Sequence, residues 1–137
     1  MIAIPSGSAI YLCTTATDMR KSFDGLSGIV RGEFGREPND GSLFLFINRR
    51  RDRIKILHWE EGGFVLWYKR LESGTFEEVA SSDGKSVATI DATQLSMLLS
   101  GVSLRSIKRR KRFSRGRDAS AGSAGDGVAR RDQKVAF

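Results

Sequence analysis

The sequence predicts an α+β fold, in which an antiparallel β-meander of about four to six strands packs against an N-terminal and a C-terminal helix. Three observations lead to this prediction. Short apolar and β-branched runs, separated by turns, fill the middle of the chain. Before them, apolar residues recur at helical spacing, and after them a second apolar stripe follows a capping signal.

The N-terminal third of the sequence predicts one strand and one helix. Residues Ser8–Leu12 include consecutive β-forming side chains, so we expect a strand there. Thr17 or Asp18 would cap the helix that follows, since short polar side chains accept hydrogen bonds from free N–H groups. Steps of three or four residues separate the members of its apolar face, which are Met19, Phe23, Leu26, Val30 and Phe34.

The middle of the sequence predicts the meander. An arginine-rich turn and two glycine-containing turns separate four apolar runs, and glycine supplies the positive φ that tight hairpins require. A fifth short run, Ser86–Ile90, adds another strand candidate. The four runs of the meander are Leu43–Asn48, Arg53–Trp59, Gly63–Leu71 and Thr75–Val79.

A final helix is predicted from Asp91 to Ser100. Asp91 is a suitable N-cap, Gln94 stands three residues later as in a capping box, and Gly101 is a suitable C-cap.

Charge divides the chain into two parts. Residues 1–104 contain 12 Lys/Arg and 13 Asp/Glu, a net charge of −1, whereas residues 105–137 contain 11 and 3, a net charge of +8. We therefore expect an α+β domain over 1–104 and a basic, low-complexity, disordered tail over 105–137. The tail begins with candidates for phosphate contacts: Arg105, Lys108, Arg109, Arg110, Lys111 and Arg112.

Several classes of protein are not expected. No run approaches the ~20 apolar residues of a membrane span, and the N-terminus does not resemble a secretory signal. The single cysteine, Cys13, excludes an internal disulfide and indicates a reducing compartment, so we expect a cytoplasmic protein. With one cysteine and one histidine, His58, we expect no zinc site, and without a glycine-rich phosphate loop we expect no cofactor or small-molecule substrate.

Catalysis is not expected either. A nuclease would need carboxylates around metal ions, and the candidates are Asp18, Asp24, Asp52, Glu60 and Glu61. Each has a simpler interpretation at a helix start or in a turn. A small metal-dependent nuclease therefore ranks below the non-catalytic interpretations.

The turn after the first strand of the meander has four arginines within the five residues from Arg49 to Arg53. A hairpin tip that carries this charge could bind phosphate groups. It could equally be a solvated loop whose charge prevents edge-to-edge aggregation. Most aromatic residues of the meander are interpreted as core; Trp59, Trp67 and Tyr68 are those whose exposure would permit stacking of unpaired bases.

Several blocks of sequence, in the same order, resemble the small accessory proteins (TnpB) of bacterial insertion elements in the insertion sequence 66 group. The resemblance covers residues 1 to about 104. It rests on Thr17-Asp18-Met19-Arg20-Lys21-Ser22-Phe23-Asp24-Gly25-Leu26, on Arg49-Arg50-x-Asp52-Arg53-Ile54-Lys55-Ile56-Leu57, on Lys69-Arg70-Leu71-Glu72-x-Gly74-x-Phe76, and on Gln94-Leu95-x-x-Leu98-Leu99-x-Gly101. Two features depart from the family pattern: Ile90-Asp91-Ala92-Thr93 precedes Gln94, and the tail is longer than usual.

The resemblance implies a role in transposition beside a separate transposase that carries the cutting chemistry. It supplies no catalytic residues. We expect contact with DNA, with the transposase and other proteins of the same element, or with both. The candidate contact residues are Arg20, Lys21, Arg49, Arg50, Arg53, Lys55, Lys69 and Arg70. The alternative is a pure protein-interaction module that docks on a transposase subunit without touching DNA, which the neutral charge of residues 1–104 favours.

Overall fold

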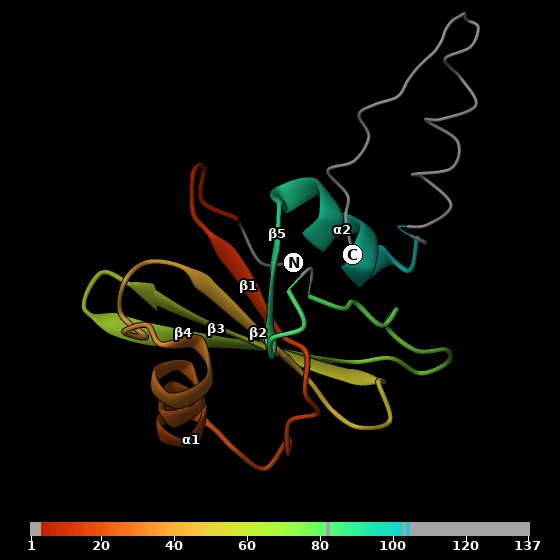
Figure 1. The fold of residues 1–137 in the computed structure, drawn as a ribbon, viewed down its shortest axis with the longest axis horizontal. Coiled ribbons are helices and arrows are strands. Elements are labelled where there is room, and N and C mark those ends of the chain that lie inside the picture. Colours follow the sequence, from red (N-terminus) through yellow and green to blue (C-terminus); the bar gives the residue numbers. More distant parts are fainter. Residues whose placement is uncertain (1–3, 82, 103, 105–137) are drawn as a thin grey trace, which may run out of the picture.

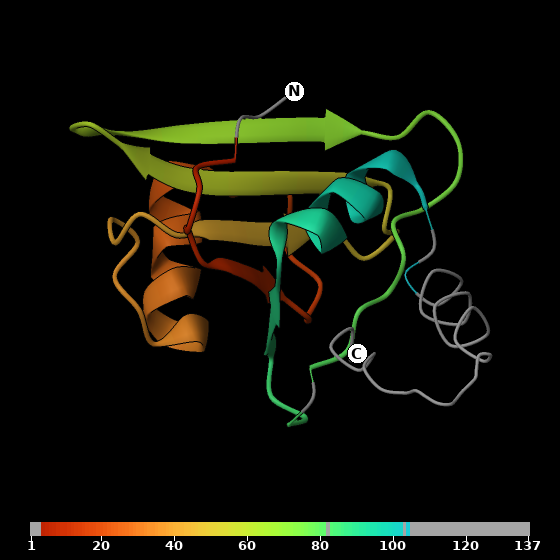
Figure 2. The same cartoon turned by 90° about the horizontal axis from the view of Figure 1, so that it is seen from above.

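The computed structural model describes residues 4–81, 83–102 and 104. Its five-stranded sheet has the order β4-β3-β2-β1-β5, and Figure 1 and Figure 2 show the helices α1 and α2 on opposite sides of that sheet. The described part of the chain therefore forms three layers. The elements are β1 (Ile10–Cys13), α1 (Phe23–Ile29), the π-helical turn η1 (Val30–Phe34), β2 (Leu43–Ile47), β3 (Arg53–Glu60), β4 (Gly63–Arg70), β5 (Val87–Ile90) and α2 (Ala92–Ser100).

The β2 strand is buried on both faces, because all five of its residues are apolar and a helix covers each side. Phe44 and Phe46 pack in one cluster with Leu26 of α1 and Val30 of η1. The alternate residues of β2 join a second cluster with the buried stripe of α2. This second cluster includes Leu43, Leu45, Ile47, Ile54, Ile56, Leu95, Leu98 and Leu99.

The sheet is mixed, which corrects the predicted antiparallel meander. β1 pairs in parallel with β2, whereas the other three pairings, β1–β5, β2–β3 and β3–β4, are antiparallel. A parallel pair requires a crossover, and the chain makes it through α1 and η1. The prediction missed this pairing because the residues that it joins, such as Ile10 and Leu43, lie far apart in the sequence.

The first helix begins later than predicted. Its N-cap is Ser22, whose side chain makes no capping hydrogen bond, so the proposal of Thr17 or Asp18 as cap is wrong. Met19 precedes the helix and packs, half-buried, against the cluster on the α1 side. The π-helical turn η1 follows α1 directly and is capped by Gly35, whose φ of 63° is in the left-handed region that favours glycine.

Thr75–Val79 is not a strand, contrary to the prediction. Phe76 and Val79 are nevertheless buried in the cluster on the α2 side. The backbone N–H of Phe76 donates to the carbonyl of Arg51 at 2.7 Å, rather than to a neighbouring strand. The apolar residues of this run therefore reflect burial in the core rather than strand pairing.

The remaining strands and the second helix lie where the sequence predicts them, within two residues at their ends. The capping box of α2 is present: the Asp91 carboxylate accepts the N–H of Gln94 at 2.7 Å, and the Gln94 side chain accepts the N–H of Asp91 at 2.8 Å. Gly101 ends the helix with a φ of 83°. The predicted basic tail, 105–137, lies outside the described residues.

Loss of this cap should weaken the α2 layer. We expect Asp91→Ala to lower the free energy of unfolding by about 1 kcal/mol, because N–H groups at the helix start lose their acceptor. Urea unfolding followed by circular dichroism measures the change. Ser96→Ala is the matched control, since Ser96 is exposed on the same helix, and an equal loss in both variants would contradict the capping role.

Candidate nucleic-acid interface

Asn48 organises the turn between β2 and β3. Its side-chain oxygen accepts the backbone N–H groups of Asp52 and Arg53, both at 3.0 Å, and its amide donates to the Asp52 carboxylate at 2.8 Å. Its backbone carbonyl accepts the N–H of Arg51 at 3.0 Å. The turn is therefore held by one asparagine, which the sequence analysis did not single out; an Asn that follows a strand at the start of a turn was the available signal.

Arg51 points away from its arginine neighbours. Its φ of 61° is left-handed, and its guanidinium donates to the carbonyls of Phe76 at 3.0 Å and Glu77 at 2.6 Å. One of the four arginines thus fastens the segment after β4 to the hairpin. It is engaged within the fold and is not presented to a ligand.

The loop between β1 and α1 lies beside this hairpin. The N–H of Thr17 donates to the carbonyl of Ile47 at 2.9 Å, at the end of β2. The Lys55 ammonium, on a side chain that is only 6% exposed, donates to the carbonyls of Met19 at 2.8 Å and Lys21 at 2.7 Å. Lys55 therefore positions the loop and is not available as a surface contact.

A groove of about 590 Å³ separates the loop from the hairpin. We call it the arginine groove. It brings together three of the predicted contact residues, Arg49, Arg50 and Arg53, from the hairpin. Its full lining is Ala16, Thr17, Asp18, Met19, Asn48, Arg49, Arg50, Asp52 and Arg53.

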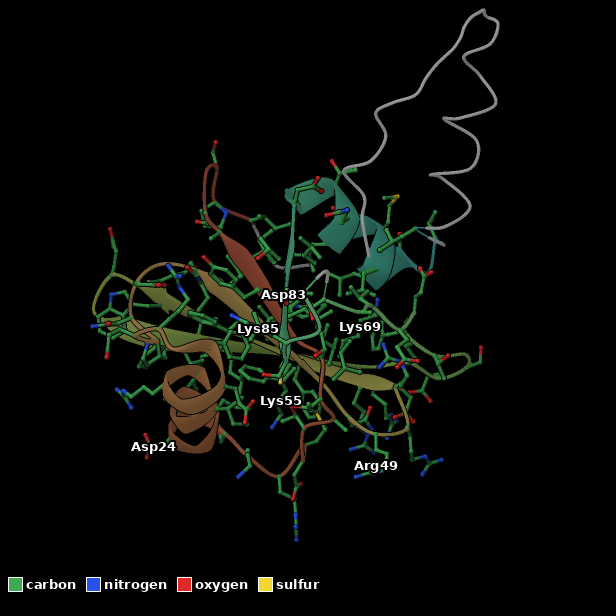
Figure 3. All side chains as sticks on the ribbon, viewed as in Figure 1. Asp24, Arg49, Lys55, Lys69, Asp83 and Lys85 are labelled. Carbon is green, nitrogen blue, oxygen red and sulfur yellow. The ribbon has the colours of Figure 1, made fainter. Side chains whose placement is uncertain are left out.

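Arg49 and Arg50 are exposed at the tip of the hairpin, and Figure 3 shows Arg49 at the outer end of the sheet. Within the described residues, neither forms an ion pair with a carboxylate. The nearby Asp52 has a lowered pKa, chiefly because Asn48 donates to its carboxylate and also because Arg50 and Arg53 are close. Two guanidinium groups therefore remain available to an anion.

Arg20 is paired within its own loop. Its guanidinium donates to both carboxylate oxygens of Asp18, at 2.7 to 3.1 Å, although its side chain is 91% exposed. This hydrogen bonding, together with the backbone N–H of Arg20, lowers the pKa of Asp18 to about 2. Lys21 is exposed beside this pair.

The remaining predicted contacts lie elsewhere. Lys69 is on the other face of the sheet from Lys55 (Figure 3), where its ammonium donates to the carbonyl of Leu99 at the end of α2, at 3.2 Å. Arg70 pairs with Glu72 at 3.0 Å. The six predicted tail contacts lie outside the described residues.

The described residues contain no group of three or more His, Cys, Asp and Glu side chains that could hold a metal ion. His58 is buried, with its Nδ1 3.3 Å from the carbonyl of Ser42, and Cys13 is buried in the core on the α1 side. Among the helices described, none has the length and apolar character to cross a membrane.

We expect Lys55→Met to lower the free energy of unfolding by about 1–3 kcal/mol, because two carbonyls lose a charged donor. The loop should also open more often, so amide hydrogen exchange at residues 18–22 should accelerate relative to the rest of the protein. Lys85→Met is the control, since Lys85 is exposed. Unchanged exchange in Lys55→Met would show that the ammonium does not hold the loop.

The pKa of Asp18 provides a second check on the loop. We expect a carboxyl-carbon NMR titration of the wild-type protein to give a pKa of about 2 for Asp18. Arg20→Ala removes the largest cause of the depression, so the pKa should rise towards 3.8, the ordinary value. The Asp18–Arg20 contribution to stability is present above that ordinary value and is lost as the pH falls towards 2. An Asp18 titration that Arg20→Ala leaves unchanged would contradict the pairing.

Comparison with known proteins identifies the family. Residues 8–109 match the model of the family described as IS66 Orf2 like protein. Two relatives come from Sinorhizobium fredii (strain NBRC 101917 / NGR234): "Uncharacterized protein y4jC" is 30% identical over 110 residues, which are 80% of this chain and 92% of the relative. "Uncharacterized protein y4hO" is 38% identical over 105 residues, which are 74% and 89% of the two chains. No solved structure matches. The chain belongs to the IS66 Orf2-like family of insertion-sequence proteins, which connects it with transposition.

Proposed function

We propose that this protein is a non-catalytic accessory protein of insertion-sequence transposition that contacts DNA phosphates through the arginine groove. The observation that carries the proposal is the position of Arg49 and Arg50, exposed on a fixed turn and without a carboxylate partner among the described residues. Guanidinium groups bind phosphate with two parallel hydrogen bonds and stay charged at every physiological pH.

The rigidity of the turn supports this role. Asn48 fixes the backbone at the base of the turn, and Lys55 holds the opposite wall of the groove. Side chains on a fixed backbone lose less conformational freedom when they bind. The tail, with its net charge of +8, would add attraction to phosphates without sequence preference.

Docking on a transposase subunit, without DNA contact, is the second candidate. The net charge of −1 over residues 1–104 favours it, because a domain that binds DNA over a broad surface usually carries a positive balance. In this account the exposed arginines would meet acidic residues of the partner protein. The two candidates differ in whether removal of the arginines changes affinity for DNA.

The test measures binding of the full-length protein to a labelled DNA duplex by fluorescence anisotropy over a range of salt concentrations. A plot of log affinity against log salt concentration has a slope that reports the number of phosphate contacts. We expect Arg49→Ala/Arg50→Ala to reduce the magnitude of this slope by about two, because each lost phosphate contact reduces it by about one. Arg31→Ala/Lys85→Ala is the control. It removes the same charge from exposed positions that do not line the groove, so its dependence on salt should resemble that of the wild-type protein.

Equal effects of the two double variants would show that net charge, and not the groove, determines the affinity. If the wild-type protein did not bind DNA, the proposed DNA contact would be wrong, and docking on the transposase would be the remaining candidate function.

A further inference from the structure

A second hollow, of about 320 Å³, adjoins the arginine groove on the outer strand of the sheet. Its lining is Arg53, Tyr68, Arg70 and Glu72, and we call it the tyrosine hollow. Arg53 lines both the groove and the hollow, so the two lie next to each other at this residue. β4, which carries Tyr68, is the edge strand, and Figure 2 shows it at the border of the sheet.

Tyr68 is the most exposed of the large hydrophobic side chains described, with 48% of its surface accessible. Most other aromatic residues of the sheet are occupied in packing: Phe44 and Phe46 are buried, and Trp67 packs against the α2-side core. Trp59 contacts Phe64 edge to face, with 4.9 Å between ring centroids. Tyr68 is therefore an aromatic surface that the fold leaves open.

The ring is also held in place. The Lys55 ammonium lies 4.7 Å from its centroid, on one face, and Arg53 donates to its hydroxyl at 3.1 Å. Despite this contact with Lys55, Tyr68 keeps 48% of its surface accessible. A ring that is fixed at two points and remains about half exposed loses little freedom when a flat ligand stacks on it.

We infer that Tyr68 is a stacking platform for an unpaired base, and that the surface formed by the arginine groove and the tyrosine hollow binds single-stranded DNA in preference to duplex. This inference rests on the proposed function and specifies its substrate. Arg49, Arg50 and Arg53 would hold the phosphates of the strand, while one of its bases covers Tyr68. Arg70 is partly neutralised by Glu72 and contributes less charge.

The preference for a single strand follows from the geometry of the bases. In a duplex, neighbouring base pairs cover both faces of each base, so none is free to stack on a protein ring. An unpaired strand exposes those faces, and aromatic rings between basic side chains are the usual means of binding it without sequence preference. Phosphate contacts alone would not distinguish the two forms in this way.

The test compares a labelled oligo-dT strand with a duplex of the same length, using the full-length protein and anisotropy. We expect Tyr68→Leu to weaken binding of the single strand by roughly tenfold, the effect of losing one stacked base, and to change duplex binding little. Tyr68→Phe keeps the ring and should retain the preference. Val65→Ala is the control, because Val65 is a similarly exposed apolar residue on the same strand, outside both the groove and the hollow.

A second measurement needs no variant. An abasic strand of equal length keeps the phosphates and lacks the bases, so the wild-type protein should bind it roughly tenfold less tightly than oligo-dT. Equal affinity for abasic and normal strands, or equal affinity for strand and duplex, would overturn the stacking role while leaving DNA contact intact. Failure to bind either strand or duplex would overturn the proposed function as well.

Discussion

Because all five residues of β2 are apolar and buried, each face of the sheet must be covered by its own helix. The chain meets this requirement by placing α1 on one face through the crossover between β1 and β2, and α2 on the other after β5. The β2–β3 turn lies beyond the end of this buried strand and is exposed at its tip. Removal of either helix would leave a row of apolar side chains in water, at a cost of about 25 cal/mol for each Å² exposed.

The neighbouring arginines of the β2–β3 turn have different roles. Arg51 adopts left-handed backbone geometry and turns back to hold the segment around Phe76, which covers the core on the α2 side. Arg49 and Arg50 remain at the tip, and Arg53 lies at the start of β3 within reach of Tyr68. A count of charges in the sequence treats these four side chains alike. The backbone conformation places Arg51 in contact with the segment after β4, whereas the other three arginines line the arginine groove.

Local signals made much of the fold predictable. The continuous apolar run of β2, the turn after β3 and the capping box of Asp91 and Gln94 each depend on residues close together in the sequence. The errors concern contacts between distant residues. The parallel pairing of Ile10 with Leu43 cannot be recognised from the sequence of either segment alone. The apolar residues of Thr75–Val79 resemble those of a strand, because burial and β pairing favour similar side chains.

The candidate site was predictable to a similar degree. The arginine turn was evident from composition, but the sequence did not indicate that Lys55 and Lys69 would each donate to backbone carbonyls, or that Asp18 and Asp52 would line the groove. Both carboxylates have lowered pKa values, so they add negative charge to the lining of the groove at neutral pH. In the proposed DNA contact, the phosphates would therefore lie at the exposed residues Arg49 and Arg50. In that proposal, a strand that continues past Arg53 would reach Tyr68, where one of its bases would stack.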